Sequence, residues 1–104
     1  MTHGQPFTLN EQVVYQTDAV VSKTLLDKKI GTITLFSFDA GQGLSEHTAP
    51  FDAVVQILDG TAAITIDGTT QQVSAGQMII MPANLPHALK AEVPFKMLLV
   101  MIRA

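Results

Sequence analysis

The chain has 104 residues, of which 47% are hydrophobic and 14% are charged, a composition that suits one small domain with a single core. The net charge is -3 and the six lysine and arginine residues are spread singly or in pairs, so nucleic acid is excluded as an expected partner. The absence of cysteine excludes disulfides, thiolate metal sites and thiol catalysis. The first residues show no secretory leader, and the longest apolar run, residues 97–102, is too short to span a bilayer. We therefore expect a cytoplasmic protein without a membrane partner.

Residues 1–12 form a polar N-terminal arm in which Thr8 and Glu11 have the spacing of a capping box. This spacing favours one short helical turn. An arm without a cap is an equally open interpretation, because so short a signal is weak. Beyond the arm, residues 13–15 and 20–26 are rich in β-branched residues and are predicted as two short strands.

The next predicted strand covers residues 31–39. Its apolar residues begin with Ile33 and Leu35 on one face and then change phase to Phe36 and Phe38. One extra residue turns all the following side chains of a strand to the other face, so the change of phase predicts a β-bulge or a strong bend here.

Glycine and proline turns divide the remainder of the chain. Asp59-Gly60 and Asp67-Gly68 are typical of type I′ turns, and they predict two successive hairpins. A further turn at Ala75-Gly76 leads to a buried strand at residues 78–81. A rigid loop with two prolines then brings His87 to the start of a strand. The closing strand is predicted at residues 95–103.

About ten short strands therefore recur between turns, and no segment carries an apolar stripe with a period of 3.6 residues. This pattern predicts an all-β sandwich or barrel, in one domain over residues 1–104. It does not distinguish one antiparallel barrel from another.

The stretch GQGLSEHTAPFDAVVQILDG, residues 41–60, resembles the first conserved motif of the cupin family. That motif runs Gly, five residues, His-x-His, three or four residues, Glu, six residues, Gly. Gly41, His47 and Gly60 match it. Ala49 stands at the position of the second histidine, and Ala53 stands at the position of the glutamate.

The second cupin motif is present in outline in GQMIIMPANLPHALKA, residues 76–91. Gly76, Pro82 and His87 match. Asn84 replaces the usual glycine, which is acceptable because asparagine readily adopts positive φ. Ala91 replaces the asparagine that usually ends the motif.

The resemblance covers residues 30–102 and implies a double-stranded β-helix, or jelly-roll, barrel of the cupin-2 type with degenerate metal-binding motifs. In the family, three histidines and a glutamate converge on a divalent transition metal inside the barrel. Here the resemblance implies only His47 and His87 as ligands. Since metal sites usually have three or more protein ligands, any zinc, nickel, iron, manganese or copper would be weakly held.

The same resemblance implies a ligand pocket around the two histidines. Because alternate residues of a strand share a face, Ala49 and Ala53 are expected beside them, with Phe38 and Phe51 as apolar wall. Glu46 and Asp52 are expected on the opposite strand face. Met78, Met81, Met97 and Met101 are predicted as core fillers rather than metal ligands. Two interpretations of the histidines stay open, as metal ligands or as polar residues that hydrogen-bond each other or water.

These features favour a small-molecule-binding or sensing cupin, because alanine rather than another ligand stands at the two lost metal positions. The alternative is a metal-dependent oxygenase, isomerase or epimerase, and a purely structural role comes third. A homodimer is also predicted. Residues 54–58 and 97–102 are apolar on both faces, whereas a small barrel covers only the inner face.

Overall fold

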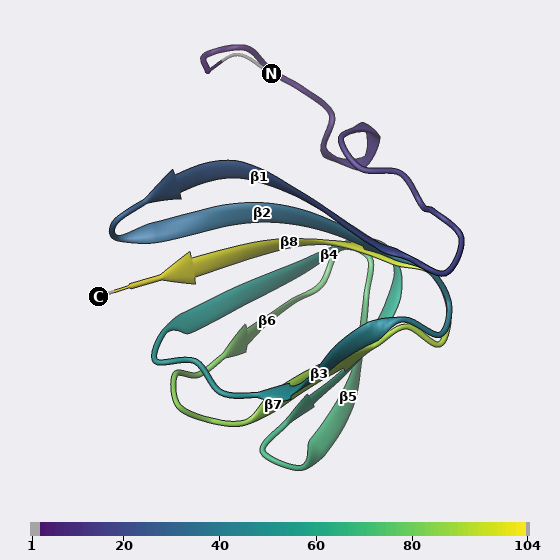
Figure 1. Ribbon diagram of the computed structural model, residues 1–104, viewed down its shortest axis with the longest axis vertical. Helices are drawn as coiled ribbons and strands as arrows, with labels where there is room; N and C mark the ends of the chain where they lie inside the picture. Colours follow the sequence, from purple (N-terminus) through teal and green to yellow (C-terminus); the bar gives the residue numbers. More distant parts are fainter. Residues whose placement is uncertain (1–2, 104) are drawn as a thin grey trace.

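The computed structural model describes residues 3–103, and Figure 1 shows two curved β-sheets that form a wedge. One short 3-10 turn, Leu9–Glu11, precedes the strands. The strands are β1 Val20–Lys28, β2 Gly31–Phe38, β3 Gly43–His47, β4 Asp52–Ile66, β5 Thr69–Ser74, β6 Met78–Met81, β7 His87–Lys90 and β8 Phe95–Ile102. The prediction of an all-β jelly roll is confirmed, with these eight strands rather than about ten.

Strand β4 is 15 residues long and belongs to both sheets. Its first half pairs with β6 and β8, and the first sheet continues from β8 to β2 and β1. Its second half pairs with β5 and β7, and the second sheet ends at β3 beyond β7. All of these pairs are antiparallel. The wedge in Figure 1 is closed where β4 passes from one sheet to the other.

The predicted hairpin at Asp59-Gly60 is wrong, because both residues lie inside β4. Gly60 has a φ of 73°, as the sequence signal required, but the positive φ serves a bulge and not a turn. The pairing with β8 passes from Ile57 opposite Met97 to Asp59 opposite Lys96 and leaves Leu58 as the extra residue. Such a bulge bends the strand, and here the bend falls between the two sheets.

The second predicted turn, Asp67-Gly68, is confirmed. Asp67 has a φ of 48° and Gly68 a φ of 84°, and they connect Ile66 to its partner Thr69. Positive φ at both central residues is the mark of a type I′ turn.

The change of phase in β2 has a different cause from the bulge that we expected in this strand. The register of β2 with β8 is unbroken, and the irregularity lies in β1, where Leu25 is the extra residue. Phe36 and Phe38 face the core between the sheets, whereas Leu35 points to the outer face and is also fully buried. The part of β2 around Leu35 is therefore covered on both sides.

The segment that continues the N-terminal arm to Tyr15, and that is included in the arm from here on, provides this outer cover. Val13 is buried, and the Ser37 hydroxyl donates a hydrogen bond of 2.7 Å to the carbonyl oxygen of Val14. The Tyr15 hydroxyl donates one to the Asp59 carboxylate. Residues 13–15 do not form the predicted strand. The predicted helical turn is present at Leu9–Glu11, without a side-chain cap at its start.

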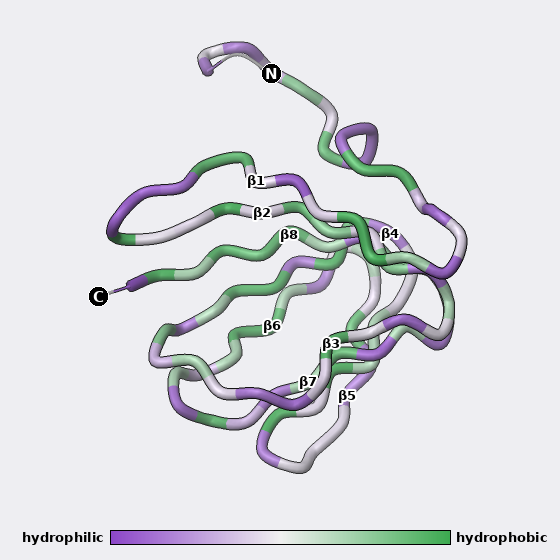
Figure 2. Tube along the Cα trace, viewed as in Figure 1, coloured by the Kyte–Doolittle hydropathy of each residue, from purple (hydrophilic) through white to green (hydrophobic). Residues whose placement is uncertain are grey.

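The core lies between the two sheets. The rings of Phe38 and Phe95 stack with their centroids 4.5 Å apart, and both side chains are fully buried. Figure 2 shows β6 and β8 as mainly hydrophobic and β5 as pale to hydrophilic. Strand β6 is less buried than predicted, since Met78 and Ile80 lie on the outer face and are exposed. Within residues 3–103, no helix is long and apolar enough to cross a membrane.

Candidate functional site

The two histidines of the motifs meet across the pair formed by β3 and β7. His47 is the last residue of β3 and His87 is the first residue of β7, and the two residues are direct partners in the antiparallel register. The positive φ of Asn84, 68°, shapes the turn before β7. The Asn84 amide also donates a hydrogen bond of 2.8 Å to the carbonyl oxygen of Ala49, which joins the two segments that carry the rings.

Three contacts orient the two imidazole rings. The Nε2 atoms of His47 and His87 lie 3.1 Å apart, with the ring centroids 4.3 Å apart. On the far side of each ring, Nδ1 of His47 lies 2.8 Å from the carbonyl oxygen of Ser45. Nδ1 of His87 lies 3.3 Å from the carbonyl oxygen of Leu85. Each histidine is thus anchored by the carbonyl group two residues before it and presents Nε2 to its partner.

Each of the three contacts is a hydrogen bond only if a proton lies between its two atoms. The three contacts together therefore need three protons. Two neutral imidazoles carry only two N–H groups. These satisfy the two shorter contacts if His47 donates from Nδ1 to Ser45 and His87 donates from Nε2 to His47. A cation bound by both Nε2 atoms would instead let His87 donate from Nδ1 to Leu85. All three contacts are satisfied only when the pair holds a third proton or a cation.

The third proton is disfavoured near neutral pH. Burial and then the nearby charge of a protonated His47 lower the pKa of His87 below its ordinary value of 6.5, and the Leu85 carbonyl acts in the opposite direction. Only 5% of His87 is exposed, whereas His47 is exposed. His87 therefore favours its neutral, electron-donating form, and the pair can be reached from the His47 side.

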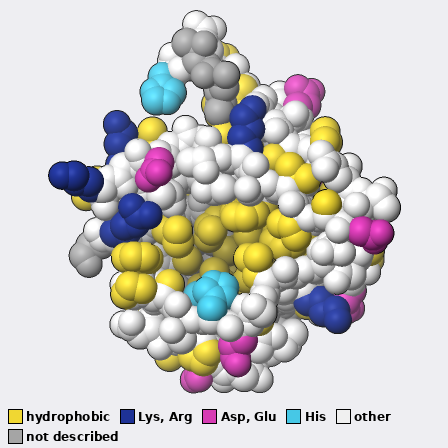
Figure 3. Space-filling model, viewed as in Figure 1, with side chains coloured by type: hydrophobic (Ala, Val, Ile, Leu, Met, Phe, Trp, Pro, Cys, Tyr) yellow, Lys and Arg dark blue, Asp and Glu magenta, His cyan; other side chains and the backbone are white. Residues whose placement is uncertain are grey.

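The pair opens on a cavity of about 60 Å³ between the sheets. Figure 3 shows a hollow on this face that is lined with apolar side chains and has a histidine ring at its border. The cavity is lined by His47, His87, Leu44, Ala49, Ala53, Met81, Leu89, Met97, Leu99 and Met101. The histidines are its only ionisable lining residues within the described part of the chain.

Comparison with known proteins decides the family. The model of the cupin domain matches residues 34–102. The chain belongs to the cupin family. A crystal structure of a conserved protein of unknown function from Streptococcus pyogenes is 43% identical, with a TM-score of 0.95, and the match covers 100% of this chain and 91% of that one.

Two further matches agree with this assignment. A cupin superfamily protein from Desulfitobacterium hafniense is 28% identical with a TM-score of 0.93, over 100% of this chain and 95% of that one. An uncharacterized protein of Streptomyces coelicolor is 34% identical over 56 residues, which are 54% of this chain and 53% of that one. The match therefore spans about half the length of this curated relative.

The six residues predicted for the pocket of this cupin do not all line the cavity. His47, His87, Ala49 and Ala53 line the cavity. Phe38 does not line it, because it is buried in the core against Phe95. Phe51 does not line it either, and its ring lies 5.5 Å from the guanidinium of Arg103. Phe38 faces the interior but packs against Phe95 instead of the cavity, and Phe51 precedes β4, so strand alternation does not place its side chain.

The carboxylates nearest the histidines in sequence are not part of this site. Glu46 is exposed on β3. Asp52 accepts a hydrogen bond of 2.9 Å from the amide of Ala83, so it holds the loop before His87. No group of three or more histidine, cysteine, aspartate or glutamate residues within residues 3–103 could surround a metal ion.

The histidine pair fits two ligand positions of one metal ion. Two nitrogens that each lie about 2.0 to 2.1 Å from an ion are at most about 4.2 Å apart, and the observed separation of 3.1 Å satisfies this limit. The carbonyl contacts of both Nδ1 atoms are of the kind that fixes the tautomer of metal-binding histidines. The family's other two ligand positions are Ala49 and Ala53, which supply no donor.

Of the other side chains of the cavity, only Leu89 follows from the sequence, because it shares a strand face with His87. Leu44 and Leu99 belong to strands whose inward faces could be inferred only after their register was known. Met81, Met97 and Met101 were correctly predicted as interior residues, but not as neighbours of the histidines. Their separation from the motifs along the chain gave no signal of this proximity.

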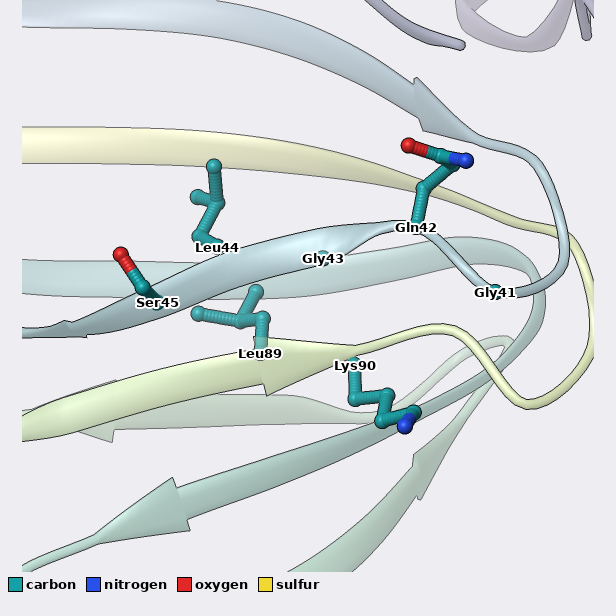
Figure 4. Close-up of a pocket in the computed structure, with 7 residues that line it drawn as sticks. All are labelled: Gly41, Gln42, Gly43, Leu44, Ser45, Leu89 and Lys90. Atoms are coloured by element: carbon teal, nitrogen blue, oxygen red, sulfur yellow. The ribbon is translucent and has the colours of Figure 1, made fainter. Parts of the chain in front are cut away.

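A second depression lies on the surface beside β3 and β7. Figure 4 shows its lining, in which the side chains of Gln42 and Lys90 extend in opposite directions. It shares Leu44 and Leu89 with the histidine cavity. Gln42 belongs to this separate depression and does not line the histidine cavity.

Proposed function

We propose that this cupin binds a small organic molecule in the cavity between its two sheets, with the histidine pair as its polar anchor. The observation that carries the proposal is the meeting of the two Nε2 atoms at the wall of an otherwise apolar cavity. A few converging polar groups in an apolar recess are typical of small-molecule sites.

The size of the cavity limits what can enter. Its volume of about 60 Å³ is far below the roughly 300 to 1,000 Å³ of pockets that hold drug-sized ligands. It suits a group of a few non-hydrogen atoms. The ligand is therefore a short aliphatic compound with one polar end, or a larger molecule that inserts such an end and leaves its remainder in the hollow of Figure 3.

The imidazoles give this ligand one donor and one acceptor. A ligand that replaces the contact between the two Nε2 atoms can accept the Nε2 proton of His87 and donate an O–H to the Nε2 lone pair of His47. A weakly held divalent metal would be bound by the same His47 and His87, and it would act as a Lewis acid toward a ligand oxygen. Its remaining ligands would be water or the organic molecule, since Ala49 and Ala53 provide none.

The test is a titration of the isotope-labelled protein, followed by NMR, with butanol and isobutyrate as probes and with EDTA present. We expect shifts in the histidine ring signals and in the methyl signals of Leu44 and Leu99. His47→Ala with His87→Ala should weaken probe binding at least about tenfold, since it removes both anchors.

The matched control is His3→Ala, because His3 is an exposed histidine of the arm. It should bind the probes as the unaltered protein does. Equal binding by the double variant would contradict the proposal. Conversion of a probe to a product in a parallel titration with a divalent metal in place of EDTA would instead support the metal-dependent enzymatic alternative.

We further propose that two copies associate through the outer face of the first sheet. An in-register row of apolar residues crosses all five strands of this face: Ile80, Val54, Val100, Ile33 and Leu26. At a strand spacing of about 4.8 Å the row is roughly 19 Å wide. Its outermost member, Ile80, is 59% exposed.

A second copy is the occupant that best suits this face. The arm covers the part of the outer face around Leu35 and Ser37 and leaves the row open. An apolar groove of about 240 Å³ beside the row is bordered by Ile30 and Ile102, both exposed. A face that is apolar along a straight row can match its own copy across a twofold axis. The cavity opens between the sheets, so it would stay accessible in the dimer.

A further inference from the structure

The place of the family's glutamate is occupied by Ala53, and its neighbours are two methionines. Ala53 is paired with Met81 of β6 on one side and with Met101 of β8 on the other. Directly opposite residues in antiparallel strands point to the same face, with Cβ atoms about 4.5 to 5.5 Å apart. Two thioethers therefore flank the position from which the carboxylate is missing.

Both methionines belong to the lining of the cavity on which the histidine pair opens. Met81, Met101, His47 and His87 all line the same cavity. Met81 is buried, with 3% of its surface exposed, and Met101 is half-buried. The alanine between them leaves room that a glutamate side chain would fill.

The donor atoms of this cavity are therefore two imidazole nitrogens and thioether sulfurs, without a carboxylate. Thioether and imidazole donors suit monovalent copper, whereas carboxylate oxygens suit manganese, magnesium and calcium. The charge of the ion gives a second reason. The idealised cost of burying an ion grows with the square of its charge, so a monovalent ion costs about a quarter as much as a divalent ion of equal size.

We propose that the cavity is a selective site for monovalent copper, Cu(I), bound by Nε2 of His47, Nε2 of His87 and the sulfur of Met81 or Met101. The inference rests on the proposed binding role of the histidine pair. It differs from the family's site in its ion and in half of its ligands. The substitutions that remove the histidine and glutamate ligands of a divalent metal leave a set of donors suited to a softer ion.

The experiment is an anaerobic titration of the full chain with Cu(I) in competition with bathocuproine disulfonate, alongside a Zn(II) titration in competition with a zinc indicator. We expect one Cu(I) per chain. Met81→Leu with Met101→Leu keeps the apolar volume, and it should weaken Cu(I) binding at least about tenfold while it changes Zn(II) binding less than about threefold. The X-ray absorption spectrum of the Cu(I) form should show a copper–sulfur shell that the double variant lacks.

The matched control is Met78→Leu, since Met78 lies on the same strand but is 58% exposed on the outer face. It should leave Cu(I) binding unchanged. Ala53→Glu should raise the affinity for Zn(II) at least about tenfold and thereby shift the preference toward divalent ions. Circular dichroism confirms that each variant is folded before it is titrated.

Two results would overturn the inference. One is an unchanged Cu(I) affinity in the folded double methionine variant. The other is the absence of Cu(I) binding by the unaltered protein. Neither result affects the binding of butanol or isobutyrate in EDTA, so failure of the copper site and failure of the proposed organic-ligand site are distinguished.

Discussion

The backbone of Gly60 lies so close to the carbonyl oxygen of Pro94 that a Cβ atom at residue 60 would collide with it. Gly60 also has a φ of 73°, a backbone angle that residues other than glycine rarely adopt. It sits at the bulge where β4 leaves the first sheet. Two independent constraints therefore require glycine at this position.

We predict that Gly60→Ala lowers the free energy of unfolding by more than about 2 kcal/mol, because strain of the left-handed backbone adds to the collision. Gly76→Ala is the matched control, since Gly76 has a φ of 87° and open space where a Cβ would lie. It should cost about 1 kcal/mol. Urea denaturation measures the free energy of unfolding of both variants. Equal decreases would mean that the backbone near Pro94 shifts to make room for the Cβ atom.

Asn84 provides a second test of backbone conformation. Its φ of 68° predicts that Asn84→Gly is neutral or slightly stabilising. Asn84→Val should cost about 1 kcal/mol or more, because a β-branched residue is strained at positive φ. Thermal melts compare the two variants. Identical melting temperatures would show that the turn before β7 relaxes without cost.

Local sequence signals predicted this fold well where a turn depends only on neighbouring residues. Asp67-Gly68 forms the expected turn, and its two residues connect Ile66 directly to its partner Thr69. Asp59-Gly60 carries the same signal, yet the chain continues as a strand, since β8 and β5 provide partners on either side of it. The local pattern specified a positive φ and could not specify whether the strand would end there.

The site could be predicted only at its motif positions, which are His47, His87, Ala49 and Ala53, and at Leu89 on the strand face of His87. His47 and His87 lie at motif positions, and the motif order brings them together. The methionines beside Ala53 depend on the registers of β6 and β8 with β4, and these registers result from packing across the whole sheet. The burial of Leu35 could not be predicted either, because it depends on the N-terminal arm, which packs on the sheet without forming a strand.

The lowered pKa of His87 predicts how stability depends on pH. Its folded pKa lies below its ordinary value of 6.5, so the unfolded chain binds more protons as the pH falls through 6.5 toward the folded pKa. Stability should therefore decrease on acidification through this range and be fully present above it. His87→Gln should flatten this dependence. Urea denaturation at several pH values tests it, with His3→Ala as the control, and an unchanged slope in His87→Gln would contradict it.

If the protein is a dimer, a single substitution in the apolar row should halve its mass in solution. Val100→Glu places a charge in the middle of the apolar row and should yield a monomer, because an unpaired charge in an interface is costly. Light scattering at micromolar concentration measures the mass. Thr70→Glu, an exposed change on the second sheet, should keep the dimer. A monomeric unaltered protein at that concentration would refute the dimer itself.

Because β4 contributes half of its length to each sheet, neither sheet can lose it without disturbing the other. Many small domains open locally, so that their amide protons exchange with solvent over a wide range of free energies. Here the buried amides on both sides of the Gly60 bulge belong to one continuous strand. They should exchange through a common, global opening, which makes the wedge a single cooperative unit around its cavity.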